Sequence, residues 1–280
     1  MKTTIKLISI LIISLALIVA CGKGEKMEHK KVTYTSIKDI PETTWKRLSE
    51  KKIFFGHQSV GFNIIDGIGD VMKEYPQIKL NIIETHDPKQ FDSPIFGHSR
   101  VGKNTDPNSK CDAFAEYLKS GIGNKVDIAF LKFCYVDVRA NTNPQEVLDY
   151  YTKTIESLKK EYPKVTFVHF TVPLTVTKTS IKTWIKKIIG KKDIWEYDDN
   201  IKRNEYNELL KQYYKDKEPV FDLAGIESTF ADGKRCTFSR DGKTYYSLVP
   251  EYTTDGGHLN EKGRKIVAEK LLVFLANLVQ

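Results

Sequence analysis

Short apolar segments alternate with helical patterns along most of the chain, and this alternation constrains the fold more than any other feature. Five segments have the length and apolar content of buried strands. They span residues 53–55, 79–83, 126–133, 165–172 and 220–223. Strands that alternate with helices form parallel sheets through right-handed crossovers, with helices on both faces. We therefore expect a three-layer α/β/α sandwich with a five-stranded parallel sheet.

The segments between these strands predict six helices, one hairpin and one long loop. The helices span residues 36–50, 63–75, 112–119, 144–161, 201–214 and 260–279, and the hairpin spans 236–248 with its turn at Asp241-Gly242. Residues 86–110 are rich in Pro, Gly, Asn, Asp and Ser, which predicts a long loop of the kind that is usually functional or disordered. In parallel sheets the ligand binds beyond the carboxyl ends of the strands, so functional groups should follow strands.

The N-terminus resembles the export signal of a bacterial lipoprotein. Two lysines, Lys2 and Lys6, precede an apolar run over residues 8–20 that is too short to span a bilayer comfortably. The run ends in Ile-Val-Ala-Cys at residues 18–21, which resembles a lipobox. The resemblance implies lipidation of Cys21 and an extracytoplasmic location at the cell envelope. An ordinary signal peptide or an uncleaved anchor is the alternative.

The predicted domain organisation has three parts. Residues 1–20 form the signal peptide, residues 21–35 a flexible tether, and residues 36–280 one folded domain. The net charge is +8, from 44 basic and 36 acidic side chains. No nucleic-acid motif accompanies this mixed surface, so no nucleic-acid partner is predicted. The three cysteines after the lipobox allow at most one disulfide bond, and no metal-ligand spacing is present, so neither metal nor cofactor is predicted.

The first candidate site is the segment Phe-Phe-Gly-His-Gln-Ser-Val-Gly at residues 54–61. It places Ser59 in a tight, glycine-flanked turn between a strand and a helix. A serine hydroxyl becomes a nucleophile when a base takes its proton. The free N–H groups at a helix N-terminus can stabilise a developing oxyanion. A simple N-cap role for Ser59 is the alternative.

The second candidate site is the segment Thr-Asp-Gly-Gly-His-Leu-Asn at residues 254–260. Asp255 and His258 lie three residues apart in a loop that precedes the last helix. A bend at the two glycines would let the carboxylate orient the imidazole that deprotonates a serine. A capping aspartate beside an unrelated surface histidine is the alternative.

Together the two sites resemble the first and last sequence blocks of the SGNH/GDSL hydrolases. The Asp-x-x-His-Leu-Asn ending, followed by a glycine-containing amphipathic helix, is the most specific match. Residues 170–174, 203–210 and 220–223 are similar to the fourth strand, the helix and the fifth strand that precede the histidine block. The likeness covers residues 53–278 and implies the flavodoxin-like sheet of that family.

The chain departs from the family in the first block, which is Gly-Asp-Ser-Leu. With Ser59 as nucleophile, Gln58 stands at the aspartate position and His57 at the glycine position. A second register starts from Gly56, puts Gln58 at the serine position and implies an inactive site. We prefer the first register because Ser59 is followed at once by Val-Gly and a helix.

The oxyanion hole is matched only in part. The resemblance implies a glycine N–H, for which Gly102 is the best match and Gly97 the second. It also implies an asparagine after the third predicted strand, but residues 132–137 read Lys-Phe-Cys-Tyr-Val-Asp. Because the loss of one such donor typically costs a factor of about 10²–10³ in rate, another group should replace it. Asn104 and Tyr135 are the candidates.

The resemblance therefore implies an exported, lipid-anchored serine esterase. Ser59 would attack an ester, His258 would act as base and Asp255 would orient the imidazole. The N–H groups of Ser59 and Gly102, with Asn104, would hold the oxyanion. The implied substrate is an acylated small molecule or carbohydrate, with deacetylation of a glycan as the first expectation. The alternatives are a polysaccharide O-acyltransferase of the same fold and a glycan-binding lipoprotein whose hydrolase site has decayed.

Residues 175–200 form an insertion that predicts a basic amphipathic helix. Its apolar side chains follow helical spacing, at Ile181, Trp184, Ile185, Ile188 and Ile189, and lysines supply the opposite side. A helix packed on the domain with a solvated lysine face is one interpretation. A helix resting on a membrane surface or an anionic glycan is the other.

Overall fold

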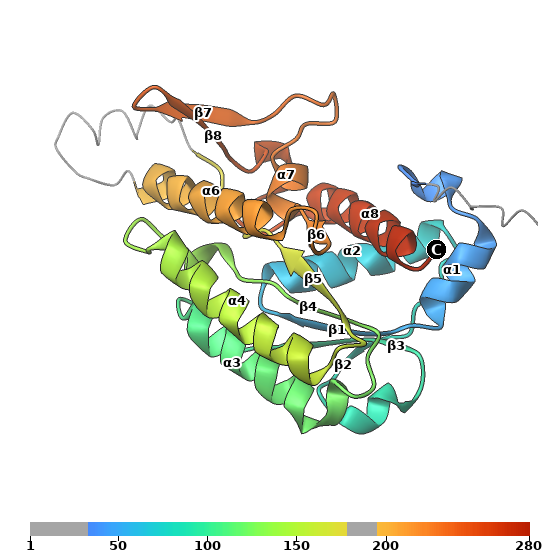
Figure 1. Cartoon of the computed structure of the whole chain (residues 1–280). Coiled ribbons are helices and arrows are strands. Elements are labelled where there is room, and N and C mark those ends of the chain that lie inside the picture. The colour runs from blue at the N-terminus through green and yellow to red at the C-terminus, as the bar shows by residue number, and fades with distance from the viewer. Residues whose placement is uncertain (1–32, 178–194) are drawn as a thin grey trace, which may run out of the picture. The chain divides into compact units, whose positions relative to one another are not determined.

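The central sheet has six parallel strands, one more than the sequence predicts (Figure 1). The computed structural model describes residues 33–177 and 195–280. The strands lie in the order β2-β3-β1-β4-β5-β6. Their bounds are β1 Lys52–His57, β2 Ile82–Glu84, β3 Ile95–Arg100, β4 Ile128–Leu131, β5 Thr166–Phe170 and β6 Val220–Phe221.

The additional strand is β3, which lies within the predicted long loop. Residues 86–110 contain a short 3-10 helix at Pro88–Asp92, then β3, then the first turn of the helix α3 at Pro107–Tyr117. β3 pairs with β1 along its whole length and with β2 on its other side, so it lies inside the sheet. The loop prediction was wrong because β3 begins with two apolar residues and continues as Gly-His-Ser-Arg, although all but the last of its residues are buried.

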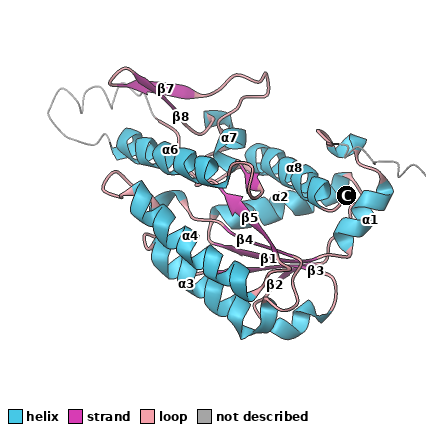
Figure 2. Cartoon of the chain, in the orientation of Figure 1, coloured by secondary structure: helices cyan, strands magenta, loops and turns pink. Residues whose placement is uncertain are grey.

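Helices cover both faces of the sheet, which confirms the predicted three-layer α/β/α sandwich (Figure 2). One face carries α1 Glu42–Ser49, α2 Val60–Glu74 and α8 Glu261–Leu278, and the other carries α3, α4 Pro144–Glu161 and α6 Trp195–Tyr214. Alternate strand residues face opposite layers, so Phe55 packs in the core under α2 and Phe54 in the core under α3. Within the described residues no helix is long and apolar enough to cross a membrane.

Several helix ends differ from the sequence prediction. The helix predicted over 36–50 is divided into a 3-10 turn, Ile37–Asp39, and α1, because Pro41 disfavours a helical conformation for the residue before it. α2 begins directly after Ser59 rather than at Asn63, and α6 begins at Trp195. The short helix α7, Leu223–Glu227, was not predicted. The signal peptide, most of the tether and residues 178–194 of the insertion lie outside the described residues.

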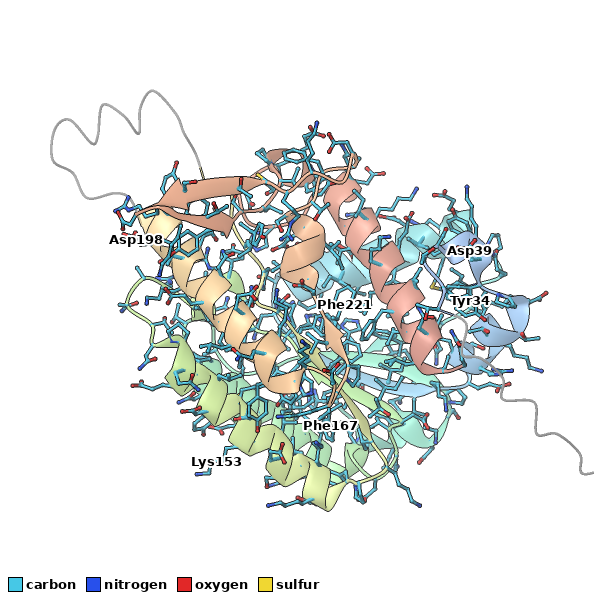
Figure 3. The ribbon with its side chains drawn as sticks, turned by 45° about the horizontal axis from the view of Figure 1, so that its top comes forward. Tyr34, Asp39, Lys153, Phe167, Asp198 and Phe221 are labelled. Carbon is cyan, nitrogen blue, oxygen red and sulfur yellow. The ribbon has the colours of Figure 1, made fainter. Side chains whose placement is uncertain are left out.

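The predicted hairpin is confirmed as β7 Thr237–Arg240 and β8 Lys243–Tyr246, joined at Asp241-Gly242. It packs on α6, where the Asn204 side chain donates to the Tyr246 carbonyl at 2.9 Å. At the start of α6, Asp198 lies 4.0 Å from the Arg240 guanidinium, and Figure 3 shows Asp198 beside the hairpin. The hairpin therefore extends the helical layer on the side of the sheet where β5 and β6 lie.

Candidate active site

The loops that follow β3, β1, β4 and β5 lie at one edge of the sheet, because these four parallel strands are neighbours. Ser59 follows β1 and is the N-cap residue of α2. Gly102 follows β3 and Cys134 follows β4. This edge therefore brings together segments that are widely separated in the sequence.

The loop with Asp255 and His258 lies at the same edge. The Val176 N–H, beyond the end of β5, donates to the Gly256 carbonyl at 2.9 Å. The Leu259 N–H donates to the Asn63 side-chain oxygen at 3.1 Å. Asn63 comes four residues after Ser59, and residues four apart share a face of a helix. The loop is therefore bonded to the face of α2 that begins at Ser59.

Asp255 and His258 form a hydrogen-bonded pair. Asp255 Oδ2 lies 2.6 Å from His258 Nδ1, while Oδ1 accepts the N–H groups of Gly257 and His258 at 2.9 and 2.8 Å. Partial burial acts to raise the pKa of Asp255, but these hydrogen bonds lower it well below its usual range. An ionised carboxylate only accepts, so Nδ1 carries a proton and Nε2 keeps its lone pair when the ring is neutral. The imidazole is thus set to act as a base through Nε2.

The Ser59 hydroxyl faces a cysteine. Ser59 Oγ lies 3.7 Å from Cys134 Sγ, within hydrogen-bond range for sulfur. In the described part of the chain no hydrogen bond joins Ser59 Oγ to His258. The structure therefore pairs Asp255 with His258 directly and connects Ser59 to them through α2 and Asn63.

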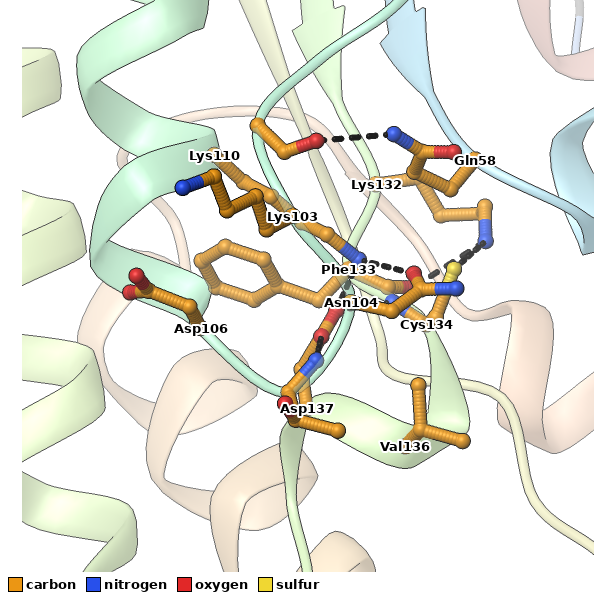
Figure 4. Close-up of polar contacts among 12 residues, drawn as sticks. Gln58, Lys103, Asn104, Asp106, Lys110, Lys132, Phe133, Cys134, Val136 and Asp137 are labelled. Atoms are coloured by element: carbon orange, nitrogen blue, oxygen red, sulfur yellow. Dashed lines mark hydrogen bonds and ion pairs between the residues drawn. The ribbon is translucent and has the colours of Figure 1, made fainter.

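The residues before Ser59 are used to build the turn. The Gln58 side-chain amide, which Figure 4 shows in a hydrogen bond to a backbone carbonyl, donates to the carbonyls of Val101 and Gly102 at 3.0 and 2.9 Å. The buried His57 ring lies 3.0 Å from the His98 ring, and a Cβ atom at Gly61 would lie 2.2 Å from His57. Because Gln58 is bound to the loop after β3, this geometry favours the register in which Ser59 occupies the nucleophile position.

The two candidate glycines occupy different environments. Gly102 lies just beyond the end of β3 with a positive φ of 50°, and a Cβ atom there would lie 2.5 Å from the backbone of Ser109 and Lys110. Both the conformation and the lack of space therefore require glycine. Gly97 lies inside β3, where a Cβ atom would meet Phe91, so its lack of a side chain serves packing.

A buried ion pair fixes the loops on both sides of β1 (Figure 4). Lys110 Nζ lies 2.5 Å from Asp137 Oδ2, and both side chains are fully buried. Asp137 also accepts the N–H groups of Cys134 and Thr105 at 2.6 and 2.9 Å. Lys110 Nζ donates in addition to Asn104 Oδ1 at 3.0 Å. The side chain of Asn104, the predicted donor, is therefore oriented by Lys110. Its oxygen faces Lys110 and its amide nitrogen points away from Lys110.

Sequence reasoning missed two polar residues next to Ser59. Lys132 is fully buried, and its Nζ donates to the Phe133 carbonyl at 3.1 Å and to Cys134 Sγ at 3.7 Å (Figure 4). Burial lowers the pKa of Lys132. Cys134 and the other two described cysteines, Cys111 and Cys236, are free thiols, so no disulfide bond forms among them. The available signal was a lysine immediately after an apolar strand, a position where parallel sheets place functional groups.

Glu227 is a second buried ionisable group in this region. Its Oε1 accepts the Leu174 N–H beyond the end of β5, and its Oε2 has no hydrogen-bond partner within the described residues. Complete burial raises the pKa of Glu227 to about 8, although the Leu174 N–H and the charges of Lys132 and Arg203 act to lower it. The unfolded chain loses this proton near the ordinary pKa of about 4.3.

We predict that Glu227→Gln becomes increasingly stabilising as the pH rises. Between pH 5 and 8 the folded protein holds a proton on Glu227 that the unfolded chain has lost, so the free energy of unfolding falls with pH. Glutamine keeps an acceptor for Leu174 and cannot ionise. The difference in free energy of unfolding between variant and wild type should grow by more than about 1 kcal/mol, or about 2–4 °C in Tm. Thermal melts at both pH values measure it, and a constant difference would contradict the prediction.

A cavity of about 470 Å³ opens beside the Asp255–Gly257 loop. The Tyr135 ring forms one wall, and its centroid lies 5.6 Å from that of His258. The remaining lining residues come from the loops after β4 and β5 and from α6, namely Val136, Arg139, Thr175, Val176, Asp199 and Arg203. His258 and Ser59 are not among the lining residues, so the cavity can hold a group bound against the Asp255–Gly257 loop and Tyr135. In the described ranges no cluster of His, Cys, Asp and Glu could hold a metal ion.

Residues 51–271 match the family model of GDSL-like lipases and acylhydrolases. No curated protein matches the chain in sequence. Among solved structures, a Streptococcus pneumoniae protein named after platelet activating factor is similar, with 18% identity and a TM-score of 0.49 over 84% of this chain and 90% of that one. A GDSL-like lipase from Bacteroides thetaiotaomicron matches with 16% identity and a TM-score of 0.42, over 79% and 86% of the two chains. The periplasmic domain of a lipopolysaccharide acetyltransferase from Salmonella Paratyphi A matches with 11% identity and a TM-score of 0.42, over 80% and 83%.

Proposed function

Because the chain belongs to the GDSL-like lipase/acylhydrolase family, whose members act on ester bonds, we propose that it is a serine esterase with Ser59 as its nucleophile. The observation that carries the proposal is the Asp255–His258 pair, 2.6 Å apart, in a loop bonded to the α2 face that begins at Ser59. The alternative, a glycan-binding protein whose hydrolase site has decayed, does not require an imidazole that is partly exposed and oriented by a carboxylate.

The proposed reaction is acyl transfer to water. Ser59 Oγ attacks the ester carbonyl carbon, its proton passes to His258 Nε2, and the carbonyl electron pair moves onto oxygen. The N–H groups of Ser59 and Gly102 stabilise this oxyanion, and Asn104 supplies a third donor. The protonated His258 then gives its proton to the leaving alcohol, and a water molecule releases the acyl group by the same route.

We propose an acylated carbohydrate as the substrate class. The cavity beside Asp255 offers an aromatic ring at Tyr135, a hydroxyl at Thr175 and a guanidinium at Arg139. These groups can stack on a sugar ring and hydrogen-bond its hydroxyls. Release of acetate from an acetylated oligosaccharide, measured beside hydrolysis of p-nitrophenyl acetate, tests both the activity and the substrate class. Loss of both activities in Ser59→Ala is the result that the proposal requires.

We also propose that the enzyme is exported and anchored at the cell envelope through Cys21. The support is the lysine-led apolar run that ends in Ile-Val-Ala-Cys. Cys21→Ala is expected to abolish incorporation of a labelled fatty acid and to release or misprocess the protein, because the lipidated side chain is gone. Cys236→Ala is the matched control and should label like wild type. Labelling that persists without Cys21 would sink the lipoprotein assignment.

A further inference from the structure

Two successive polar contacts lead from the proposed nucleophile into the protein interior. They join Ser59 to Cys134 and Cys134 to Lys132, and we call these three residues the line. Cys134 Sγ lies 3.7 Å from Ser59 Oγ. It also lies 3.7 Å from Lys132 Nζ, and Figure 4 shows these two side chains in contact. Cys134 and Lys132 have no exposed surface, so their contact with each other is shielded from water. Hydrogen bonds in such surroundings are electrostatically stronger than in water.

The direction of these hydrogen bonds follows from the groups involved. A lysine ammonium has donors and no acceptor, so sulfur accepts from Lys132. Among the described residues Ser59 Oγ is the one hydrogen-bond partner of the Cys134 S–H, and we assign the thiol as the donor in this contact. Ser59 Oγ then accepts this hydrogen bond from Cys134, and the hydroxyl proton of Ser59 is left to point toward a base. The line therefore runs as a donor chain from Lys132 through Cys134 to Ser59.

We propose that Cys134 is a catalytic residue whose S–H stabilises negative charge on Ser59 Oγ during attack, with Lys132 as the positioning residue that polarises and orients the thiol. This inference rests on the proposed serine esterase. The proton of Ser59 still passes to His258 Nε2 as the Oγ–carbon bond forms, and Cys134 and Lys132 keep their protons throughout. Cys134 lies in the segment after β4 where the family asparagine is missing, so the chain places a different donor at this edge of the site.

Two rates on the full chain test the proposal. One is kcat for p-nitrophenyl acetate, and the other is the rate at which a fluorophosphonate forms a P–O bond to Ser59 and releases fluoride, followed by intact mass. Cys134→Ala should lower both rates about ten-fold with KM unchanged, because it removes a donor that acts on the reacting oxygen. Cys134→Ser should restore most of the loss, because a hydroxyl can donate along the same line.

The role of Lys132 is tested through its dependence on Cys134. Lys132→Met alone should lower both rates by a factor similar to that of Cys134→Ala. In the Cys134→Ala background the same change should have little further effect, because residues that act through one another are not additive. Should Lys132→Met fail to fold, the comparison of Cys134→Ala with Cys134→Ser still decides the proposal.

The controls separate this inference from the proposed function. Cys111→Ala removes another fully buried thiol, in α3, and should leave both rates unchanged. Wild-type rates in Cys134→Ala, with Ser59→Ala inactive, would overturn the donor chain and leave the esterase intact. A fluorophosphonate that never modifies Ser59, together with full turnover in Ser59→Ala, would overturn Ser59 as the nucleophile and with it the proposed function.

Discussion

Replacing Ser59 by alanine is expected to reduce esterase turnover by about 10⁴-fold or more. The proposed reaction forms an acyl-enzyme on Ser59 Oγ, and alanine has no atom that can carry the acyl group. His258→Ala should reduce turnover by a similar factor, because without the imidazole nothing takes the Ser59 proton. The double variant should be no worse than either single variant, since the two residues act as one unit.

Asp255→Ala should cost less than either change. Asp255 does not touch the reacting atoms in the proposed reaction, and its roles are to hold Nδ1 and to stabilise the imidazolium that forms. Initial rates with p-nitrophenyl acetate measure all four variants. Ser239→Ala, an exposed serine in β7, is the matched control and should keep wild-type turnover. Wild-type turnover in Ser59→Ala would remove Ser59 from the nucleophile position, whereas absence of turnover in the wild type would favour a binding protein.

The layered fold could be predicted because its strands and helices have strong local signals. The strand predicted over 126–133 contains β4, and the helix predicted over 144–161 is α4. Both could be located because length and periodicity are properties of the sequence itself. β3 could not be found in this way. Its Gly-His-Ser stretch is buried because β1 and β2 bond to both of its edges, and that pairing depends on residues outside β3 itself.

The same distinction applies to the site. Asp255 and His258 could be predicted as a pair because they lie three residues apart in one turn. Cys134 and Lys132 could not be linked to Ser59, because their proximity arises from the pairing of β1 with β4. The role of Asp137 was equally hidden, since its partners Lys110 and Thr105 come from the segment that seemed to be a loop.

Asp137→Ala is expected to lower the free energy of unfolding by about 3–5 kcal/mol. Asp137 and Lys110 form a salt bridge with no exposed surface on either side chain, so the change leaves a buried ammonium without its counter-charge. The N–H groups of Cys134 and Thr105 lose their acceptor as well. Denaturant unfolding measures the effect. Glu251→Ala removes the exposed partner of Lys262 and should cost at most about 1 kcal/mol.

Removing both buried charges should recover part of this loss. In Lys110→Met with Asp137→Asn, no ammonium remains unpaired, and the asparagine oxygen can still accept a backbone N–H. We expect this double variant to be more stable than Asp137→Ala. At a temperature where the double variant and the wild type are both folded, its esterase turnover should be slower than that of the wild type. The reason is that Lys110 and Asp137 together hold Asn104, Thr105 and Cys134 at the edge where Ser59 lies. Equal costs for Asp137→Ala and Glu251→Ala would show that the buried pair stabilises no more than a surface pair, and the positioning argument would lose its basis.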